Sequence, residues 1–178
     1  MNFSNTYFFT ATVATVIFLS AGCKKLPRET HRGRNKMACY VNGEKWVAKD
    51  KIFNSSGLST IGSGVSNGSN PSAILYGSGN SFNISGGSKK ENQGGIIINL
   101  ITFSGVGEYE LKMRGNSESN AKYNYFDYYT DSIHTGMINI KYFTDKVLAG
   151  TFSFEAINQI GDIIKVTDGR FDIEYSIK

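Results

Sequence analysis

The residues best suited to ligand chemistry lie in a tyrosine-rich segment, residues 122–131, with the sequence KYNYFDYYTD. Exposed tyrosines present flat, amphipathic faces that suit sugar rings or partner proteins, and neighbouring carboxylates add hydrogen-bond acceptors. The segment therefore suggests a binding surface, although packing at the rim of a core is the commoner role of such tyrosines. The candidate residues are Tyr123, Tyr125, Phe126, Asp127, Tyr128, Tyr129 and Asp131.

Paired carboxylates offer a catalytic alternative. Two carboxyl groups about 5–10 Å apart can cleave a glycosidic bond. Most carboxylates here, however, fall at solvent-facing positions of predicted strands, where they act as cross-strand partners. The sequence has no catalytic elbow, zinc-ligand spacing, EF-hand spacing or nucleotide motif, so we expect a non-enzymatic domain without cofactor or metal. The candidates for the alternative, an envelope hydrolase, are Asp127, Asp131, Glu108 and Glu110.

The two cysteines have different expected roles. Cys39 lies on a predicted strand and suits a small buried hydrophobe, because the histidines that a catalytic thiol would need, His31 and His134, fall in a predicted tether and a predicted loop. Residues 19–23, Leu-Ser-Ala-Gly-Cys, resemble the lipobox of bacterial lipoproteins. That resemblance implies cleavage before Cys23 and acylation of its thiol, which leaves Cys39 without a disulfide partner.

The first 22 residues have the features of an export signal. The apolar run at residues 7–19 is shorter than the about 20 residues that a membrane-spanning helix needs, and small residues follow it. A buried N-terminal helix or strand is the alternative, but the basic residues that follow have no place in a core. Residues 1–22 are therefore predicted to be a lipoprotein signal peptide.

Positive charge is concentrated behind this signal. The net charge is +4, yet six of the 19 Lys and Arg residues lie within residues 23–36, so residues 37–178 are nearly neutral. A domain that binds nucleic acid would carry its positive charge on the folded part, so we do not expect nucleic-acid binding. Residues 23–36 are predicted to be a basic flexible tether, which either contacts anionic head groups or acts as a soluble spacer. By analogy with lipoproteins, Lys24 implies the outer membrane, and the basic tail favours a periplasm-facing domain over a surface-exposed one.

The C-terminal stretch predicts two overlapping hairpins. Asp168-Gly169 lies between two alternating apolar and polar runs and suits a two-residue type I′ turn, which would set Val166 opposite Phe171. Residues 159–161 suit a three-residue loop with glycine in the left-handed conformation. Together the two turns predict a row of charges across three strands, made of Glu155, Lys165 and Asp172.

Other strands are predicted nearer the N-terminus. A two-residue turn at Asn42-Gly43 would oppose Cys39 to Trp46, whose indole we expect in the core rather than stacked on a ligand. Residues 54–95 are rich in Gly, Ser and Asn, with apolar islands that suit two or three short strands. Residues 96–103 form a continuous apolar run that suits a strand covered on both faces.

No sustained helical periodicity follows residue 37. Residues 37–178 are therefore predicted to be a single all-β domain. The expected architecture is an antiparallel β-sandwich of meandering hairpins with about nine to twelve strands, and a partly closed lipocalin-like β-barrel is the alternative.

Several turn and strand motifs occur in a fixed order along the chain. They are Asn42-Gly43-x-x-Trp46, Gly136-x-Ile138-x-Ile140, GTFSF from Gly150 and TDGRFD from Thr167. With the lipobox, they resemble a family of uncharacterised small lipoproteins of the Bacteroidota type, described as a domain of unknown function. The resemblance covers most of residues 38–175 and implies an all-β envelope domain, without catalytic or ligand residues to carry across. The predicted function is thus a lipid-anchored domain with a non-enzymatic binding or structural role, whose partner is a glycan, a protein or a cell-wall component.

Overall fold

The computed structural model describes residues 25–49, 70–77, 80–90, 92–112, 118–124 and 127–178. Within these residues the chain forms eleven β-strands and no helix, as expected of an all-β domain. The predicted signal peptide, Cys23, Tyr125 and Phe126 lie outside the described residues. The strands are β1 (Lys36–Val41), β2 (Glu44–Val47), β3 (Ser72–Tyr76), β4 (Ser81–Gly86), β5 (Ile96–Leu100), β6 (Gly107–Leu111), β7 (Asn120–Tyr123), β8 (Tyr128–Tyr129), β9 (Gly136–Phe143), β10 (Val147–Ile157) and β11 (Ile163–Ile177).

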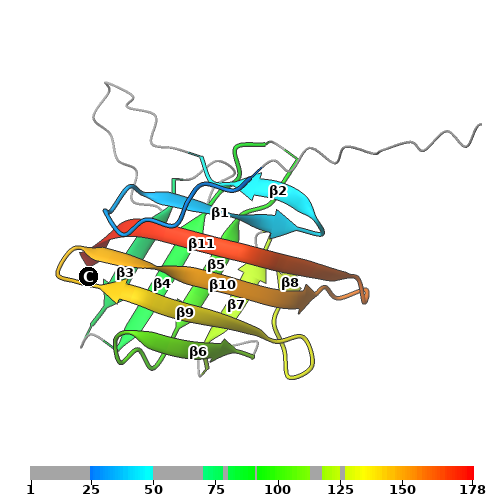
Figure 1. The fold of residues 1–178 in the computed structure, drawn as a ribbon. Coiled ribbons are helices and arrows are strands. Elements are labelled where there is room, and N and C mark those ends of the chain that lie inside the picture. Colours follow the sequence, from blue (N-terminus) through cyan, green and yellow to red (C-terminus); the bar gives the residue numbers. More distant parts are fainter. Residues whose placement is uncertain (1–24, 50–69, 78–79, 91, 113–117, 125–126) are drawn as a thin grey trace, which may run out of the picture.

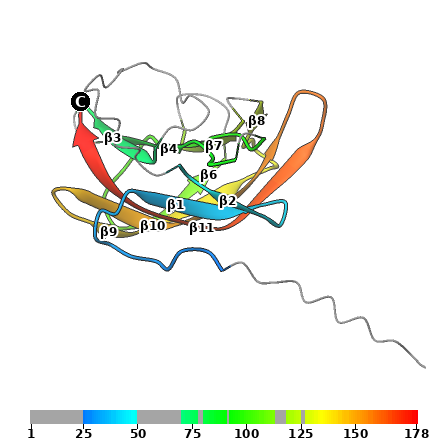
Figure 2. The ribbon, with the colours of Figure 1, turned by 90° about the horizontal axis from the view of Figure 1, so that it is seen from above.

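The strands form two layers that pack face to face (Figure 1, Figure 2). The front layer has the order β2-β1-β11-β10-β9-β6, and the back layer has the order β3-β4-β5-β7-β8. The layers join at two corners: the end of β11 pairs with β3 at Tyr175 and Ala73, and β10 pairs with β8 at Ile157 and Tyr129. The β11–β3 pairing is parallel, and the other strand pairings are antiparallel. The predicted antiparallel β-sandwich is therefore confirmed, with one parallel pair and two joined corners.

The hydrophobic core lies between the layers. Side chains alternate along β10, where Phe152 and Phe154 are buried and the residue between them is exposed. In β5, Ile96, Ile97 and Ile98 are buried in succession, as expected of a strand covered on both faces. Burying one such side chain contributes about 1.5–3 kcal/mol. The packed interior therefore stabilises the sandwich far more than any single surface contact.

Asp168-Gly169 does not form the predicted hairpin turn. β11 runs through it without a break and pairs with β1 on one side and β10 on the other. Both pairings shift register here by one residue, and Asp168 has a φ of 52°, so the dipeptide forms a β-bulge. Val166 pairs with Phe154, and Phe171 pairs with Gly150, rather than with each other. Because the bulge adds one residue, Val166 and Phe171 still share the buried face.

The predicted turn at Asn42-Gly43 is confirmed. It joins β1 to β2, and Gly43 has a φ of 79°. Cys39 pairs with Trp46 as expected, and both side chains are fully buried. The indole of Trp46 is therefore a core side chain, and its Nε1 donates a hydrogen bond to the carbonyl of Gly94 at 2.8 Å.

The loop at residues 159–161 is also confirmed, whereas the predicted row of charges is only half correct. The backbone N of Asn158 donates to the carbonyl of Asp162 at 3.0 Å and closes the loop. Lys165 Nζ lies 2.9 Å from Glu155 Oε1, as expected. Asp172, in contrast, is only 3% exposed. Since Lys165 and Asp172 belong to one continuous strand, they cannot lie opposite each other.

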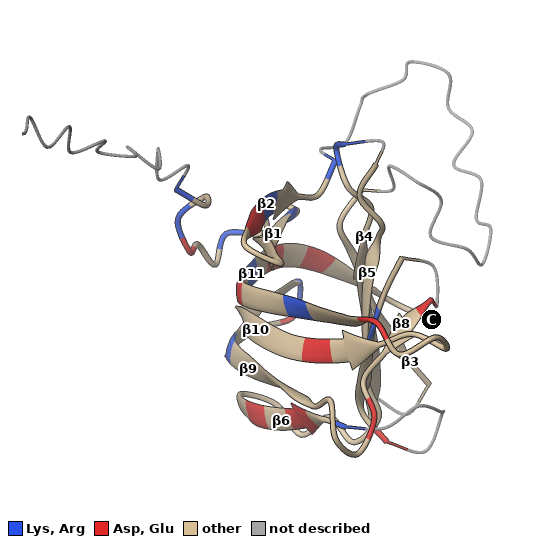
Figure 3. Cartoon of the chain, turned by 90° about the vertical axis from the view of Figure 1, so that its right-hand side faces the viewer, with Lys and Arg blue, Asp and Glu red and all other residues tan. Residues whose placement is uncertain are grey.

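Residues 25–35, which the sequence analysis placed in a flexible tether, lie along the outer face of the front layer (Figure 2). Leu26 is buried, and Arg170 Nη1 donates to the carbonyl of Pro27 at 3.0 Å. Lys and Arg recur along this segment (Figure 3). We call residues 25–35 the strap.

Candidate ligand-binding cleft

The tyrosines of the predicted segment lie around one turn at an edge of the back layer. Tyr123 ends β7, Tyr128 and Tyr129 form β8, and Tyr123 pairs with Tyr128. All three side chains are partly buried and partly accessible, and Tyr123 and Tyr128 pack against the core. These tyrosines therefore combine rim packing with an accessible face.

Two adjoining hollows share Tyr128 in their linings. One, of about 470 Å³, is lined by Asn124, Asp127, Tyr128, Tyr129, Asn158, Gln159 and Ile160. The other, of about 380 Å³, is lined by Val41, Asn42, Glu44, Asn92, Gln93, Gly94, Tyr123, Asn124, Tyr128 and Ile164. Because Asn124 and Tyr128 line both hollows, we treat the two as one tyrosine cleft.

Hydrogen bonds fix the turn that carries the tyrosines. Asn124, with a φ of 52°, donates from Nδ2 to Asp127 Oδ2 at 2.7 Å, and its carbonyl accepts from the Asp127 backbone N at 3.1 Å. The Tyr123 hydroxyl accepts from the backbone N of Gly94 at 3.1 Å. Burial raises the pKa of Tyr123, although the bond from Gly94 acts in the opposite direction, so the phenol is neutral at physiological pH.

A second wall of the cleft is the loop between β10 and β11. Asn158 Oδ1 accepts from the backbone N of Ile160 at 3.1 Å and of Asp162 at 2.8 Å, which fixes the loop from within. Ile160 projects from its tip and is 84% exposed. The pairing of Ile157 with Tyr129 brings this loop beside the tyrosines. The sequence predicts the loop, but no local signal shows which segment it faces.

The third wall, around Gly94, precedes β5. Gln93 is buried, with its Oε1 accepting from Ser88 Oγ at 3.1 Å and its Nε2 donating to the carbonyl of Lys45 at 3.3 Å. Gly94 lies so close to Asn124 that a Cβ would come within 2.5 Å of the Asn124 Cα. Sequence reasoning missed this wall, because its residues are typical of any loop.

Asp131 does not line the cleft. Its Oδ1 accepts from the backbone N of Ile133 at 2.8 Å and of His134 at 2.6 Å, and it lies 3.1 Å from His134 Nδ1. The backbone bond from His134, followed by these other contacts, lowers the pKa of Asp131 despite some desolvation. The carboxylate therefore stabilises its own loop.

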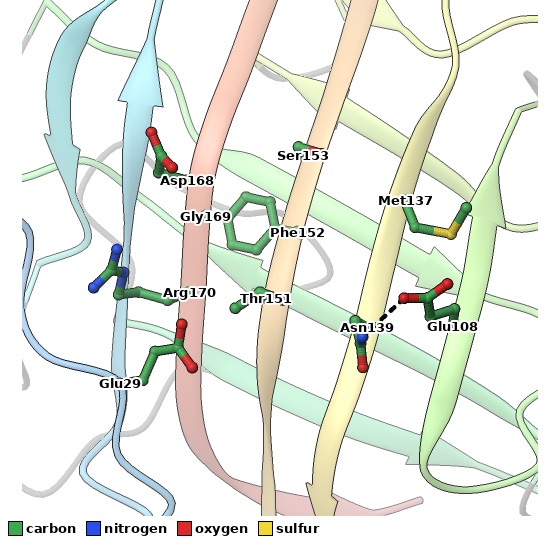
Figure 4. A pocket seen from close by; sticks show the side chains of 10 residues that line it. All are labelled: Glu29, Glu108, Met137, Asn139, Thr151, Phe152, Ser153, Asp168, Gly169 and Arg170. Atoms are coloured by element: carbon green, nitrogen blue, oxygen red, sulfur yellow. Dashed lines mark hydrogen bonds between the residues drawn. The ribbon is translucent and has the colours of Figure 1, made fainter.

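The carboxylates considered for catalysis are not gathered at one place. Asp127 lines the tyrosine cleft, whereas Glu108 lines a separate hollow of about 350 Å³ on the outer face of the front layer (Figure 4). There Glu108 Oε1 accepts from Asn139 Nδ2 at 3.0 Å. Glu110 forms an ion pair with Lys112 at 2.9 Å. Figure 4 also shows that the polar side chains of this outer hollow are spread over several strands.

Neither a metal site nor a spanning helix is found in the part of the chain that the structure describes. Its residues include no group of three or more His, Cys, Asp or Glu that could hold a metal ion. None of its segments is a helix with the length and apolar character needed to cross a membrane.

Fold and cleft together define a two-layered all-β domain with a cleft of tyrosines and side-chain amides at one end. The family described as a domain of unknown function, DUF6252, matches residues 67–173, and the chain belongs to this family. The match includes the back layer and most of β11 but not β1, β2 or the strap. Comparisons with curated proteins and with solved structures give no match.

Proposed function

We propose that this protein is a lipid-anchored cell-envelope domain of a Bacteroidota-type lipoprotein that binds a ligand without altering it, and that the ligand is an uncharged glycan held in the tyrosine cleft. The observation that carries this proposal is the composition of the cleft. Tyr128 lines two hollows whose other walls carry side-chain amides. Aromatic faces pack on sugar rings, and amides, which both donate and accept hydrogen bonds, suit hydroxyl groups.

The charge of the cleft supports a neutral ligand. Asp127 and Glu44 are the acidic residues of its lining, and Asp127 is already engaged by Asn124. No Lys or Arg belongs to the described lining, so a phosphate or carboxylate would have no cationic partner there. A protein partner or another cell-wall component is the outcome to expect if no glycan binds.

Binding measurements on cleft variants test this proposal. A glycan array first identifies a ligand, and calorimetry then compares variants. Tyr128→Ala is expected to weaken binding about tenfold or more. Because Tyr128 also packs on the core, Gln159→Ala, at an exposed position of the opposite wall, serves as a second variant and is expected to weaken binding about threefold. Tyr76→Ala removes a tyrosine that is 41% exposed outside the cleft and is the matched control. Equal affinities in all three variants would remove the cleft as the binding site.

The anchor has its own test. Mass spectrometry of the protein from native membranes is expected to show a mature N-terminus at Cys23 that carries acyl chains. Retention of Met1 would contradict both the lipid anchor and the outer-membrane location. Protease added to intact cells is expected to leave the domain uncut, because we place it on the periplasmic side.

A hydrolase acting on glycans is the second candidate, and the outer hollow favours it. Glu29, Glu108 and Asp168 all line that hollow, so its lining contains carboxyl groups from three separate parts of the chain (Figure 4). Chromogenic glycosides screened against the native protein and Glu108→Gln test this reading. Turnover that Glu108→Gln abolishes would favour the hydrolase, and the absence of turnover would exclude it for those substrates.

A further inference from the structure

The strap is bound to β11 of the front layer by backbone N–H groups and by short polar side chains. Thr30 Oγ1 donates to Asp172 Oδ2, and the backbone N of Arg32 donates to the same oxygen at 3.1 Å. The backbone N of Gly33 donates to Asp172 Oδ1 at 2.7 Å. Just beyond, Asn35 Oδ1 accepts from a β11 backbone N at 2.9 Å. These bonds fix successive strap residues to one strand of the sheet.

Asp172 has the properties of a receptor for this strap. Its side chain is almost completely buried, although it belongs to an outer layer. A buried carboxylate needs several hydrogen bonds to offset its lost hydration, and the strap supplies them. Gly33 has a φ of 66°, and a Cβ there would lie 2.6 Å from Glu174 Cγ. Gly33 therefore allows the close approach that docking needs, and the charge of Asp172 is compensated only when the strap is docked.

Side-chain contacts hold other parts of the strap. Lys141 Nζ lies 2.9 Å from Glu29 Oε2, and the ring of His31 lies 4.8 Å from that of Tyr142. Both partners belong to β9, which is separated from β1 by two strands, β11 and β10. The strap thus contacts several strands of the front layer.

The strap begins next to Lys45 of β2, whose neighbour Glu44 lines the tyrosine cleft. Lys45 Nζ donates to the carbonyl of Lys25 at 2.9 Å, and the carbonyl of Lys45 accepts from Gln93 of the cleft. Glu44, which precedes Lys45, also lines the cleft. Cys23 lies two residues before Lys25, and two residues span at most about 7 Å. A lipid on Cys23 would therefore be attached to the domain within about 7 Å of Lys25, next to Lys45 of β2.

We propose that the docked strap holds the lipid anchor at the cleft end of the sandwich, so that the tyrosine cleft opens beside the membrane surface and Ile160 faces it. This orientation rests on the proposed lipidation of Cys23. Without docking, the 13 residues from Cys23 to Lys36 would allow a separation of up to about 45 Å and any orientation. With docking, the domain is held close to the bilayer and turned one way.

Trypsin cleavage tests the docking on the full chain in vesicles of outer-membrane lipid. Arg32 and Arg34 of the native strap are expected to resist trypsin. Gly33→Ala introduces a Cβ that clashes with Glu174, and Thr30→Val removes the hydroxyl that donates to Asp172. Neither change touches the core, and both variants are expected to be cleaved at Arg32 and Arg34 about tenfold faster or more. Thr30→Ser keeps the donor and is the matched control, expected to resist like the native chain. Equal, rapid cleavage of all four proteins would overturn the docked strap.

Fluorescence quenching tests the orientation. One cysteine is placed beyond the end of β10, as Ile160→Cys, and the other before its start, as Asp145→Cys. The length of β10 separates these two probe positions by about 30 Å or more. With a dye on either residue and a nitroxide on the lipid head groups, the dye at 160 is expected to be quenched at least about twofold more, and Gly33→Ala is expected to reduce this difference. Equal quenching at both positions would overturn the orientation.

The two assays separate this inference from the proposed function. A protein that does not stay with the vesicles contradicts lipidation of Cys23, and with it the membrane orientation. Resistance of Arg32 and Arg34 to trypsin would still report a docked strap in that protein, because the strap contacts require no lipid.

Discussion

The substitution Gly169→Asn tests whether Asp168-Gly169 forms a β-bulge or a hairpin turn, because the two structures predict different losses of stability. A Cβ on Gly169 would lie 2.5 Å from the carbonyl O of Phe152 and 2.6 Å from two carbons of its ring. Such overpacking costs about 1–3 kcal/mol, and a buried amide without a partner costs a further amount of about 1–3 kcal/mol. In a chain of this size each kcal/mol lowers Tm by about 2–4 °C, so a fall of about 5–20 °C is expected.

Gly43→Asn is the matched control, because Asn42-Gly43 is a true two-residue turn. Nothing lies within 4 Å of a Cβ built on Gly43, and Asn tolerates its φ of 79° better than most residues. The cost is expected to stay below about 1 kcal/mol. Thermal unfolding followed by circular dichroism measures both variants. Equal shifts of Tm at the two glycines would show that Asp168-Gly169 is an open turn and would refute the two-sided pairing of β11.

Three further predictions concern buried groups. Trp46→Phe leaves the carbonyl of Gly94 unpaired and is expected to lower the free energy of unfolding by about 2–4 kcal/mol in urea titrations; a loss below about 0.5 kcal/mol would contradict this. Burial raises the pKa of the Cys39 thiol, so a thiol reagent is expected to label Cys39 only at the rate of global unfolding. Peptide mass analysis measures the labelling rate, and a faster rate would contradict the burial of Cys39. Burial also acts on Asp172, but the bonds from the strap outweigh it and lower the pKa of Asp172. The contribution of Asp172 to strap docking is therefore fully present above the ordinary carboxyl range and is lost as the pH falls through that lowered pKa. NMR signals of the strap amides are expected to change as the pH falls below the ordinary carboxyl range, and signals that stay constant would contradict this contribution.

The comparison of two similar dipeptides shows what local sequence can predict. Asn42-Gly43 and Asp168-Gly169 share the same tolerance of positive φ, and both use it. The arms of the first pair with each other, whereas the arms of the second find partners in β1, β10 and β3. Backbone preference therefore predicts where φ is positive. The choice between turn and bulge depends on strands that are remote in sequence.

In the candidate site, too, the sequence predicts the local feature but not the contacts between segments remote in sequence. The tyrosine segment is recognisable because five aromatic residues fall within residues 122–131. The walls around Gly94 and Asn158 are not recognisable, because Gly, Asn and Gln are ordinary loop residues. They join the tyrosines through two non-local contacts, the pairing of Ile157 with Tyr129 and the close approach of Gly94 to Asn124.

The strap illustrates why composition misleads at a basic segment. Its charges suggested a solvated tether, yet its contacts with Asp172 use the Thr30 hydroxyl and the backbone N–H groups of Arg32 and Gly33 rather than its charged side chains. Asp172 looked like a solvent-facing partner of Lys165, and it is buried because the strap covers it. A buried carboxylate on the outer face of a sheet thus indicates that another segment covers it and donates hydrogen bonds to it. In the orientation that we propose for a lipidated Cys23, the docked strap would set both the distance of the cleft from the bilayer and its direction.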